Sequence, residues 1–287
     1  MMKPKKLQRT LAGLGIVLVV LVLGYLVIRP VHLRWGASDA DLLHPMPGAL
    51  SGSSWTRAIL IEATPEQIWP WLVQFGQGRG GWYSYDWLEN LLGFDIHTAD
   101  RLLPAYQNPQ IGTPICMSGS FCPSAVYVLE PYRWFGWQAT DEAGKPVWTF
   151  VFGLFPEGEN HTRLVVRESF DPVFMPPAAV IALEIPDVVM ELKMLDTLKA
   201  RAEGRPISGL VTASEIALWL AALAASLLAG WRFLRRPAWR RPLVVFVGGL
   251  VVLLLLTLLF LPLWLRGVLV AVLFAGLLWN EKRRQLS

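Results

Sequence analysis

Long apolar stretches constrain the fold of this chain more than any other feature of its sequence. The run LAGLGIVLVVLVLGYLVI at 11–28 has no charge, and the run at 213–230 carries only Glu215. The run at 243–280 is too long for one spanning helix of about 20 residues, but it suits two helices with a turn near Pro262. A mean hydropathy of +0.42 is typical of a membrane protein. We therefore expect about four transmembrane helices, at 11–28, 213–230, 243–261 and 263–280.

Lysine and arginine are concentrated at the ends of these stretches. Because cytoplasmic segments carry the excess of these residues, we place the tail 1–10, the loop 231–242 and the tail 281–287 in the cytoplasm. Residues 30–212 are then extracytoplasmic, and the protein is integral to the cell membrane, as in a bacterial inner membrane. Arg266, near the predicted turn, must reach the headgroups. The basic clusters are Lys3, Lys5, Lys6 and Arg9; Arg232, Arg235, Arg236, Arg240 and Arg241; and Lys282, Arg283 and Arg284.

The first apolar stretch has two interpretations, a retained anchor or a cleaved signal peptide. Its apolar core is longer than the 7–15 residues or so of a signal peptide, and GASDA at 36–40 is a poor cleavage site. We favour the anchor. Residues 29–56, rich in proline, glycine and serine, are then interpreted as a linker from the membrane to a domain at 57–205.

The charge of the large segment argues against a nucleic-acid partner. Residues 30–212 contain 12 lysines and arginines against 20 aspartates and glutamates. The net positive charge of the chain therefore belongs to the membrane-flanking clusters. An acidic domain has no electrostatic footprint for a phosphate backbone.

The two cysteines, Cys116 and Cys122, lie on either side of Gly119. A hairpin that turns at this glycine would bring the two sulfurs together, and an oxidising compartment would favour a disulfide. The alternative is two free thiols. Two cysteines alone do not make a zinc site, and the four histidines show no ligand spacing, so we expect no metal and no cofactor. The histidines are His32, His44, His97 and His161.

The segment FGQGRGGWYSYDW at 75–87 matches the glycine pattern of dinucleotide-binding loops. That pattern requires a strand before it and a helix directly after it. Here Thr64, Pro65 and Gln67 predict the start of a helix that leads into the glycines. We therefore expect the glycines to shape a tight connection between two helices, with positive φ or close backbone approach.

The order of elements between the spans is strand, two short helices, several strands and a long helix. RAILIEA at 57–63 alternates as a strand does, and 84–93 predicts a short helix with Ser84 as its N-cap. Strand-like runs with short turns follow, which predicts an antiparallel sheet. From 184 to 204, apolar residues recur at helical spacing with charges on the opposite side, which predicts a long helix packed on the sheet. Its apolar positions are Ile185, Val188, Leu192, Leu195 and Leu198.

The segments WPWLVQFGQGRGGWYSYDWLENLLGFDIHTADR and VMELKMLDTLKARAEG resemble an uncharacterised bacterial branch of the START-like (SRPBCC) superfamily of polyketide cyclases and lipid-transfer domains. The resemblance covers roughly residues 35–205. It implies an α+β helix-grip fold, with an antiparallel sheet around a long C-terminal helix and a cavity for an apolar ligand. It implies no particular chemistry, because members include binders, transporters and enzymes.

Alternation along the predicted strands places aromatic residues on one sheet face. Trp148, Phe150 and Phe152 share a face, which with other side chains would line an apolar pocket. The alternative is a filled core, the usual role of an aromatic stripe. The remaining candidate ligand-binding residues are Arg79, Tyr83, Trp87, Trp134, Trp137, Glu168, Met190 and Met194.

Glu168 and His97 are the two candidate catalytic residues. Strict alternation puts Glu168 on the apolar face, where a carboxylate would be a polar anchor or an acid with a raised pKa. Alternatively, the strand ends or bulges there, and Glu168 reaches solvent or an arginine. His97 lies in a polar stretch with Arg79 and Arg101, which is either a site or a set of salt bridges and caps.

Three functions remain open from the sequence. The first is a membrane-anchored domain that binds or transfers a lipid or another hydrophobic small molecule. The second is an enzyme of cyclase, dehydratase or hydrolase type that uses His97 or Glu168 in the same cavity. The third is a structural or sensory membrane protein without a ligand.

Overall fold

The computed structural model describes residues 4–235 and 239–282, which form two compact units. The helical unit comprises the chain up to Pro30 and from Ser208 onward, and the sheet unit comprises Val31–Ile207. Of the predicted basic clusters, Lys3, Arg236, Arg283, Arg284 and the rest of 283–287 lie outside the described residues.

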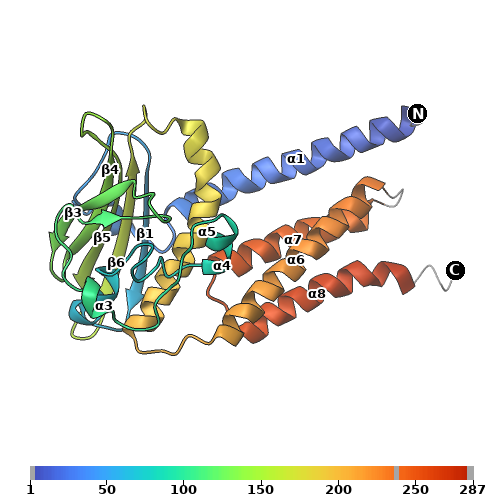
Figure 1. The fold of residues 1–287 in the computed structure, drawn as a ribbon. Coiled ribbons are helices and arrows are strands. Elements are labelled where there is room, and N and C mark those ends of the chain that lie inside the picture. The colour runs from blue at the N-terminus through green and yellow to red at the C-terminus, as the bar shows by residue number, and fades with distance from the viewer. Residues whose placement is uncertain (1–3, 236–238, 283–287) are drawn as a thin grey trace. The chain divides into compact units, whose positions relative to one another are not determined.

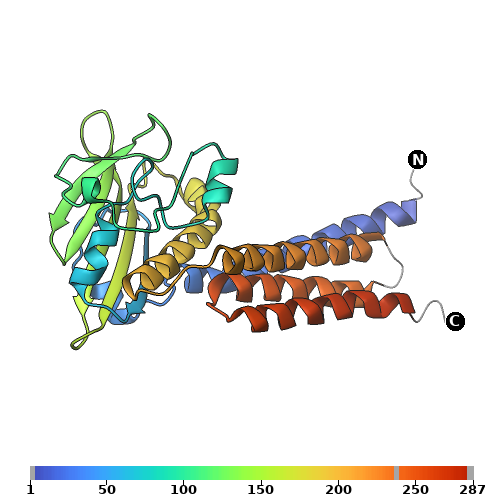
Figure 2. The ribbon, with the colours of Figure 1, turned by 60° about the horizontal axis from the view of Figure 1, so that its bottom comes forward.

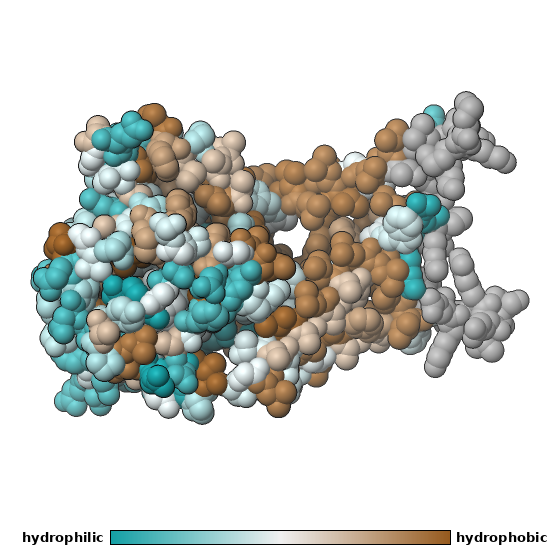
Figure 3. All heavy atoms as spheres, viewed as in Figure 1, coloured by the Kyte–Doolittle hydropathy of each residue, from teal (hydrophilic) through white to brown (hydrophobic). Residues whose placement is uncertain are grey.

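Four apolar helices make up the helical unit (Figure 1). Three are long and apolar enough to cross a membrane, with candidate spans at Leu11–Leu33, Gly209–Arg235 and Arg240–Leu258, while the apolar part of the fourth, Leu263–Trp279, is shorter. This is about the predicted count. Figure 3 shows largely hydrophobic atoms along the visible sides of these helices. The helices are α1 (Pro4–Leu33), α6 (Gly209–Arg235), α7 (Arg240–Leu258) and α8 (Leu263–Lys282).

Small residues allow α6 and α7 to pack closely. Ala225 and Ala229 of α6 are buried with Phe246 of α7. A Cβ added at Gly249 of α7 would lie 2.1 Å from Oγ of Ser226, so this glycine permits close contact between the two helices. Small side chains at helix crossings are a common solution where lipid supplies no hydrophobic drive for association.

Arg266 lies in the first turn of α8, just after the predicted turn. Its Nε donates to the carbonyl of Leu261 at 2.8 Å, and its Nη1 donates to that of Leu256 at 3.2 Å. Its Nη2 also lies 3.6 Å from Oε1 of Glu215. The guanidinium therefore caps the carbonyl end of α7, which satisfies backbone groups that a helix end leaves without partners.

The sheet unit has the predicted α+β helix-grip architecture, a six-stranded antiparallel sheet with a long helix on one face (Figures 1 and 2). The strand order is β1-β6-β5-β4-β3-β2. The elements are β1 (Ser54–Ile61), α3 (Pro65–Leu72), α4 (Asp86–Leu91), the 3-10 turn η1 (Pro104–Tyr106), β2 (Pro114–Ile115), β3 (Ser124–Glu130), β4 (Trp134–Thr140), β5 (Pro146–Pro156), β6 (Thr162–Phe170) and α5 (Pro177–Ala202).

Helix α5 covers the inner face of the sheet beside β1. Val188, Leu192, Leu195 and Leu198 are buried there, as their spacing predicts. Two parts of the prediction are wrong. The helix begins at Pro177 and leaves Ile185 exposed, and its acidic residues are not all opposite the apolar side. Glu184 and Glu191 are buried, because they fall on the same helical stripe as the apolar residues.

The aromatic residues of the inner face pack on one another. Trp137 stacks on Phe150 with ring centroids 4.8 Å apart, and Phe75 stacks on Phe152 at 5.3 Å. All four side chains are buried. The middle of the inner face is therefore a packed aromatic core.

Trp134 does not belong to this core. It lies three residues from Trp137 on β4, so the two side chains point to opposite faces of the sheet. Trp134 instead packs on the outer face, with its ring centroid 5.4 Å from that of Phe155. The expectation that Trp134 and Trp137 line one pocket is wrong.

The segment 29–56, interpreted as a linker, is packed structure. It contains the end of α1, the helix α2 (Asp39–Leu43) and the start of β1. Residues 36–48 cover the outer sheet face: Met46 is buried against Ala58 and Val165, and Arg163 Nη2 donates to Asp41 Oδ2 at 2.6 Å. Composition suggested a linker, but contacts with residues more than 100 positions away in the sequence hold the segment in place.

The glycine-rich segment is a tight loop after α3, as predicted. Gly76 and Gly81 form an antiparallel bridge, and both have positive φ. A Cβ at Gly81 would lie 2.7 Å from the Cα of Thr98, so close approach also requires glycine there. The following helix α4 starts at Asp86. Ser84 is not its N-cap, because the Ser84 hydroxyl donates to the carbonyl of Met190 at 2.9 Å.

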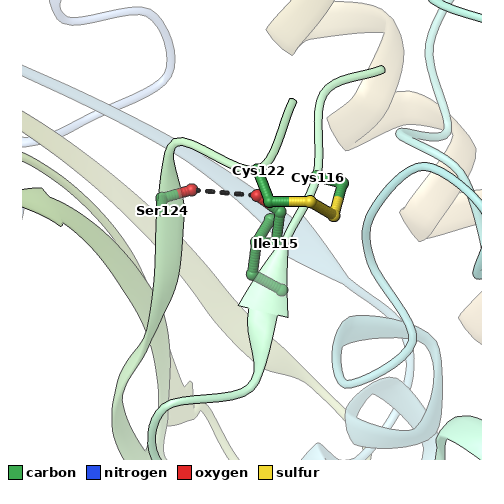
Figure 4. The surroundings of a disulfide bond; sticks show 4 residues. All are labelled: Ile115, Cys116, Cys122 and Ser124. Atoms are coloured by element: carbon green, nitrogen blue, oxygen red, sulfur yellow. Dashed lines mark hydrogen bonds between the residues drawn. A yellow bond between two sulfur atoms is a disulfide. The ribbon is translucent and has the colours of Figure 1, made fainter. Parts of the chain in front are cut away.

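Cys116 and Cys122 form a disulfide in the loop between β2 and β3 (Figure 4). The chain turns between them, with an isolated bridge from Ser118 to Phe121 and positive φ at Gly119. The carbonyl of Cys116 also accepts from the amide of Gln77 at 3.0 Å. The disulfide loop and the glycine loop therefore support each other.

We predict that Trp137→Ala lowers the free energy of unfolding of the sheet unit by about 3–5 kcal/mol, because it leaves a cavity among rings that cannot collapse onto one another. Trp87→Ala, at a side chain that is 45% exposed, is expected to cost less than about 1 kcal/mol. Pulse proteolysis of the full chain across a urea series measures both. Equal losses in the two variants would contradict a packed aromatic core.

We predict an acid-dependent loss of stability at Asp41. Burial alone would raise the pKa of this carboxyl, but hydrogen bonds from Arg163 and Ser38 outweigh it and lower the pKa to about 2. Since the folded-state pKa lies below the unfolded value of 3.8, the stabilisation is present above about pH 4 and lost as pH falls toward 2. Asp41→Asn should cost roughly 1–2 kcal/mol at pH 7 and remove this slope. Asp39→Asn is the exposed control, and its pH profile should match that of the unmodified chain.

Candidate functional site

Four ionisable side chains meet between the sheet and α5. We call Arg57, Glu168, Asp187 and Glu191 the acid–arginine cluster. In the sheet register Trp55 pairs with Glu168, and Arg57 pairs with Val166. Arg57 and Glu168 are therefore on the same face, which is the face covered by α5. Asp187 and Glu191 are four residues apart, on the side of α5 that meets this face.

Arg57 is the centre of the cluster. Its Nη1 donates to Asp187 Oδ2 at 2.7 Å and also to Glu191 Oε2. Its Nε donates to the backbone carbonyl of His32 at 2.9 Å. The residue is 1% exposed, so the guanidinium has been removed from water almost completely. A buried guanidinium is tolerated only with such close partners.

Glu168 extends the cluster toward β5. Its Oε1 accepts a hydrogen bond from Trp148 Nε1 at 2.5 Å, and the side chain is buried. The strand continues in regular register through Phe170. The interpretation that the strand ends or bulges at Glu168 and frees it to solvent is therefore wrong.

A second buried pair adjoins the cluster. His32 Nε2 lies 3.2 Å from Glu184 Oε2, and neither side chain is exposed. Because the carbonyl of His32 also binds Arg57, this pair and the cluster share one residue. Buried polar groups thus form a continuous row along α5 from Glu184 to Glu191.

Burial is the main cause that raises the pKa values of the three carboxyls of the cluster. Burial raises the pKa of Glu168 well above its usual range, and the neighbouring Asp187 and Glu191 raise it further. Burial also raises the pKa of Asp187, against the opposing effect of Arg57. Burial raises the pKa of Glu191 to about 8. Around neutral pH the cluster can therefore hold a proton and donate it in a hydrogen bond.

Several polar atoms at the cluster are buried without a hydrogen-bond partner in the described part of the chain. An unpartnered buried polar atom costs about 1–3 kcal/mol, so each such atom needs an explanation. Here they converge on one place, between β1, β6 and α5. The atoms are Trp55 Nε1, Arg57 Nη2, Glu168 Oε2 and Glu191 Oε1.

The three carboxyls have the spacing of a possible cation site but already surround a cation. Ligand oxygens of Glu168, Asp187 and Glu191 lie within 4.8 Å of one another. However, Arg57 Nη1 contacts both Asp187 and Glu191. The guanidinium thus supplies positive charge where a metal ion would sit, and we assign no metal or cofactor to these residues.

The structure brings only some of the predicted ligand-binding residues to the cluster. Trp148 binds Glu168 directly and is half-buried. Phe150 pairs with Glu168 across the strands, with Phe152 two positions further along β5. Met194 is buried on α5, and Met190 is half-buried beside Ser84.

Arg79, Tyr83 and Trp87 have other surroundings. Arg79 donates to the carbonyl of Val73 at 2.9 Å and stacks over Tyr106. Tyr83 is buried, and its hydroxyl donates to the carbonyl of Trp71 at 3.1 Å. Trp87 is exposed on α4. Arg79 and Tyr83 thus hold the loops around α3, and none of the three side chains takes part in the acid–arginine cluster.

His97 lies on the surface. Its side chain is 80% exposed and pairs with Asp95, which is 74% exposed. Nearby, Asp86 accepts hydrogen bonds from the amide and the hydroxyl of Thr98. The polar stretch from Arg79 to Arg101 therefore supports the structural interpretation, with contacts that pin α4 and its loop.

Sequence reasoning missed Arg57, Asp187, Glu191 and the His32–Glu184 pair. A signal was present for two of them. Arg57 alternates with Ile59 and Ile61 on the buried face of β1, and Glu191 lies three residues after Val188 on α5. A charged residue at a core position of an otherwise regular pattern marks a buried polar contact. His32 had no such signal, because it ends an apolar helix.

Comparisons with known proteins find solved structures of similar fold but no protein of similar sequence. No family model matches the chain, and no curated protein matches its sequence. A solved structure from Mesorhizobium loti is 15% identical and covers 54% of this chain and 100% of its own, with a TM-score of 0.33.

Two further solved structures are similar to the chain to the same degree. A polyketide-cyclase-like protein from Corynebacterium glutamicum is 20% identical over 55% of this chain and 91% of its own, with a TM-score of 0.28. The di-domain ARO/CYC protein StfQ from the steffimycin biosynthetic pathway is 12% identical over 53% of this chain and 50% of its own, with a TM-score of 0.31. Likenesses of this size carry nothing about what the sheet unit binds.

We predict that stability falls as pH rises through the neutral range, because of the cluster. The folded-state pKa values of its carboxyls are raised, so the folded state keeps protons that the unfolded state releases. The stabilisation is complete below about pH 4.5 and declines toward pH 8, the value for Glu191. Glu168→Gln keeps an acceptor for Trp148 and should raise the free energy of unfolding at pH 8 by roughly 1–3 kcal/mol, with little change at pH 5.

Pulse proteolysis of the full chain at pH 5 and pH 8 measures this effect. Glu142→Gln, at an exposed turn position, is the control and should change neither value. A loss of stability at pH 8 in Glu168→Gln would show that Glu168 is held as a carboxylate by Arg57.

Proposed function

We propose that the sheet unit binds an apolar small molecule with one polar end, such as a lipid, and that the acid–arginine cluster holds the polar end. The observation that carries this proposal is the set of four buried polar atoms without partners at Trp55, Arg57, Glu168 and Glu191. A ligand group that both donates and accepts hydrogen bonds, such as a hydroxyl or a protonated headgroup, would satisfy them.

Apolar side chains next to the cluster suit the rest of such a molecule. Trp55 and Phe170 pack together with ring centroids 4.8 Å apart, and Val180 completes their cluster. Trp148 and Met175 are partly buried against it. Ligand sites in proteins combine an apolar wall with a few placed polar groups, and this end of the inner face has both. The packed core around Trp137 borders this end through Phe150, which pairs with Trp137 on one side and with Glu168 on the other.

The apolar helices support a membrane setting for this activity. A binding unit attached to spans on both sides would take its ligand from, or deliver it to, the lipid phase. We propose in addition that this unit is extracytoplasmic in a bacterial inner membrane, on the basis of the basic clusters. The disulfide between Cys116 and Cys122 supports an oxidising compartment.

Acid–base catalysis in the same place is the second candidate. The raised pKa values of Glu168 and Glu191 favour it, because a carboxyl that titrates near neutral pH can act as a general acid. Glu168 is the residue that would serve, since Glu191 is bound to Arg57. The exposure of the His97 side chain argues against a role for it as a general base.

Photo-cross-linking of the full chain tests the binding proposal. The chain is placed in lipid nanodiscs with a diazirine-bearing palmitic acid, irradiated and digested. We expect cross-linked peptides from β5, β6 or the middle of α5, besides those from the apolar helices, which serve as an internal standard. Glu168→Leu should lower the yield in the sheet-unit peptides by about tenfold, as expected when a buried polar anchor is lost, and leave the helices unchanged.

The exposed variant Glu142→Gln is the matched control and should label like the unmodified chain. Labelling confined to the apolar helices in all three proteins would overturn the proposal. The cluster would then be purely structural, as in the third function that the sequence left open.

A further inference from the structure

The segment between β6 and Asp187 is almost entirely apolar. From Val173 to Pro186 the only charged residue is Glu184, and its side chain is wholly buried. Five large apolar side chains of this segment are nevertheless exposed. We call them the α5 apolar surface: Val173 (88% exposed), Phe174 (57%), Ile181 (46%), Leu183 (42%) and Ile185 (46%).

The first turns of α5 touch the rest of the sheet unit along a narrow stripe. Of residues 177–186, only Val180 and Glu184 are buried, and the others are half or fully exposed. A helix that is apolar around most of its circumference is normally covered by protein or by lipid. Clustered exposed apolar residues in a folded unit mark an interaction surface.

Two contacts place this surface beside the end of α1. His32 lies 3.2 Å from Glu184, and Leu33 packs in the cluster that contains Val180. His32 and Leu33 are the last residues of α1, and the candidate span Leu11–Leu33 ends with them. The first turns of α5 therefore lie beside the last residues of this candidate span.

We propose that the α5 apolar surface lies in the interfacial layer of the lipid bilayer. Ten helical residues are about 15 Å long, which is half of a hydrocarbon core of about 30 Å, so 177–186 is too short to span. It is suited to lie along the membrane surface with its apolar side chains among the headgroups and upper acyl chains. Beyond the acid–arginine cluster, the next charged residue of α5 is Lys193, which is half-buried.

Continuity with the span favours lipid over a protein partner as the occupant. The apolar run at 11–28 precedes His32 and Leu33 in the chain by a few residues, and these two residues contact the first turns of α5, so the chain connection keeps the α5 apolar surface near the lipid around the span. A protein partner would have to cover a surface at the point where lipid is already present. The proposal does not depend on whether the acid–arginine cluster binds a ligand.

Spin labelling of the full chain in nanodiscs of phosphatidylcholine and phosphatidylglycerol tests the proposal. The two cysteines of the chain form a disulfide, so single cysteines can be introduced and labelled. The variants are Phe174→Cys and Ile181→Cys, and Ile111→Cys is the control. Ile111 is equally apolar and 62% exposed, but it lies in the turn before β2.

Collision rates with oxygen, which partitions into lipid, and with a water-soluble nickel chelate are measured at each label. We expect the oxygen-to-nickel ratio at 174 and 181 to exceed that at 111 by about threefold or more, because the two sites lie in the interface. Ratios equal to that at 111 would mean that the surface faces water. Low rates with both reagents would mean that protein covers it. Either of these results overturns the proposal, and Leu183→Cys provides a second site on α5 should Ile181→Cys fold poorly.

Discussion

The burial of one guanidinium organises the sheet unit. Arg57 has left water almost completely, and an uncompensated charge in that position would cost several kcal/mol. Its compensation comes from α5 and from the end of α1, through Asp187, Glu191 and the carbonyl of His32. The helix can therefore pack on β1 in one register only, the one that brings residues 187 and 191 to residue 57. The same ion pairs that fix the fold also assemble the candidate site.

More carboxyl groups surround Arg57 than its single positive charge requires, and these additional carboxyls give the site its chemical character. One guanidinium balances one carboxylate, yet three carboxyls lie around it, and burial raises the pKa of each. The interior holds acid that an optimally stable core would replace by apolar side chains. Departures of this kind from the rules of core packing are expected at functional sites, where stability is given up for binding or catalysis.

The sequence was informative where local periodicity decides the structure. The strand alternation placed Phe150, Phe152 and Glu168 on one face, and the antiparallel pairing keeps them there. Capping residues and glycines predicted α3 and the tight loop after it. The periodicity of 188, 192, 195 and 198 predicted the buried stripe of α5, although not its start at Pro177.

The remaining features depend on contacts that no local pattern encodes. The segment 29–56 has the composition of a linker, but it is packed because distant residues bind it, as Arg163 binds Asp41. Arg57 meets its carboxyls 130 and 134 residues away. The prediction that Trp134 and Trp137 line one pocket was wrong for a simpler reason. Two residues three positions apart in a strand point to opposite faces of the sheet.

The packed cover over the outer sheet face has a consequence for how any guest could enter. Residues 36–48 close that side, and the rings around Trp137 fill the centre of the other. The side chains near the cluster that are half-buried rather than buried include Trp148, Met175 and Asp187. A molecule on its way to Glu168 would have to displace side chains of this kind, and the indole of Trp148 is itself bonded to Glu168. The rate at which a guest arrives and leaves would then depend on this displacement, independently of how tightly the interior holds it.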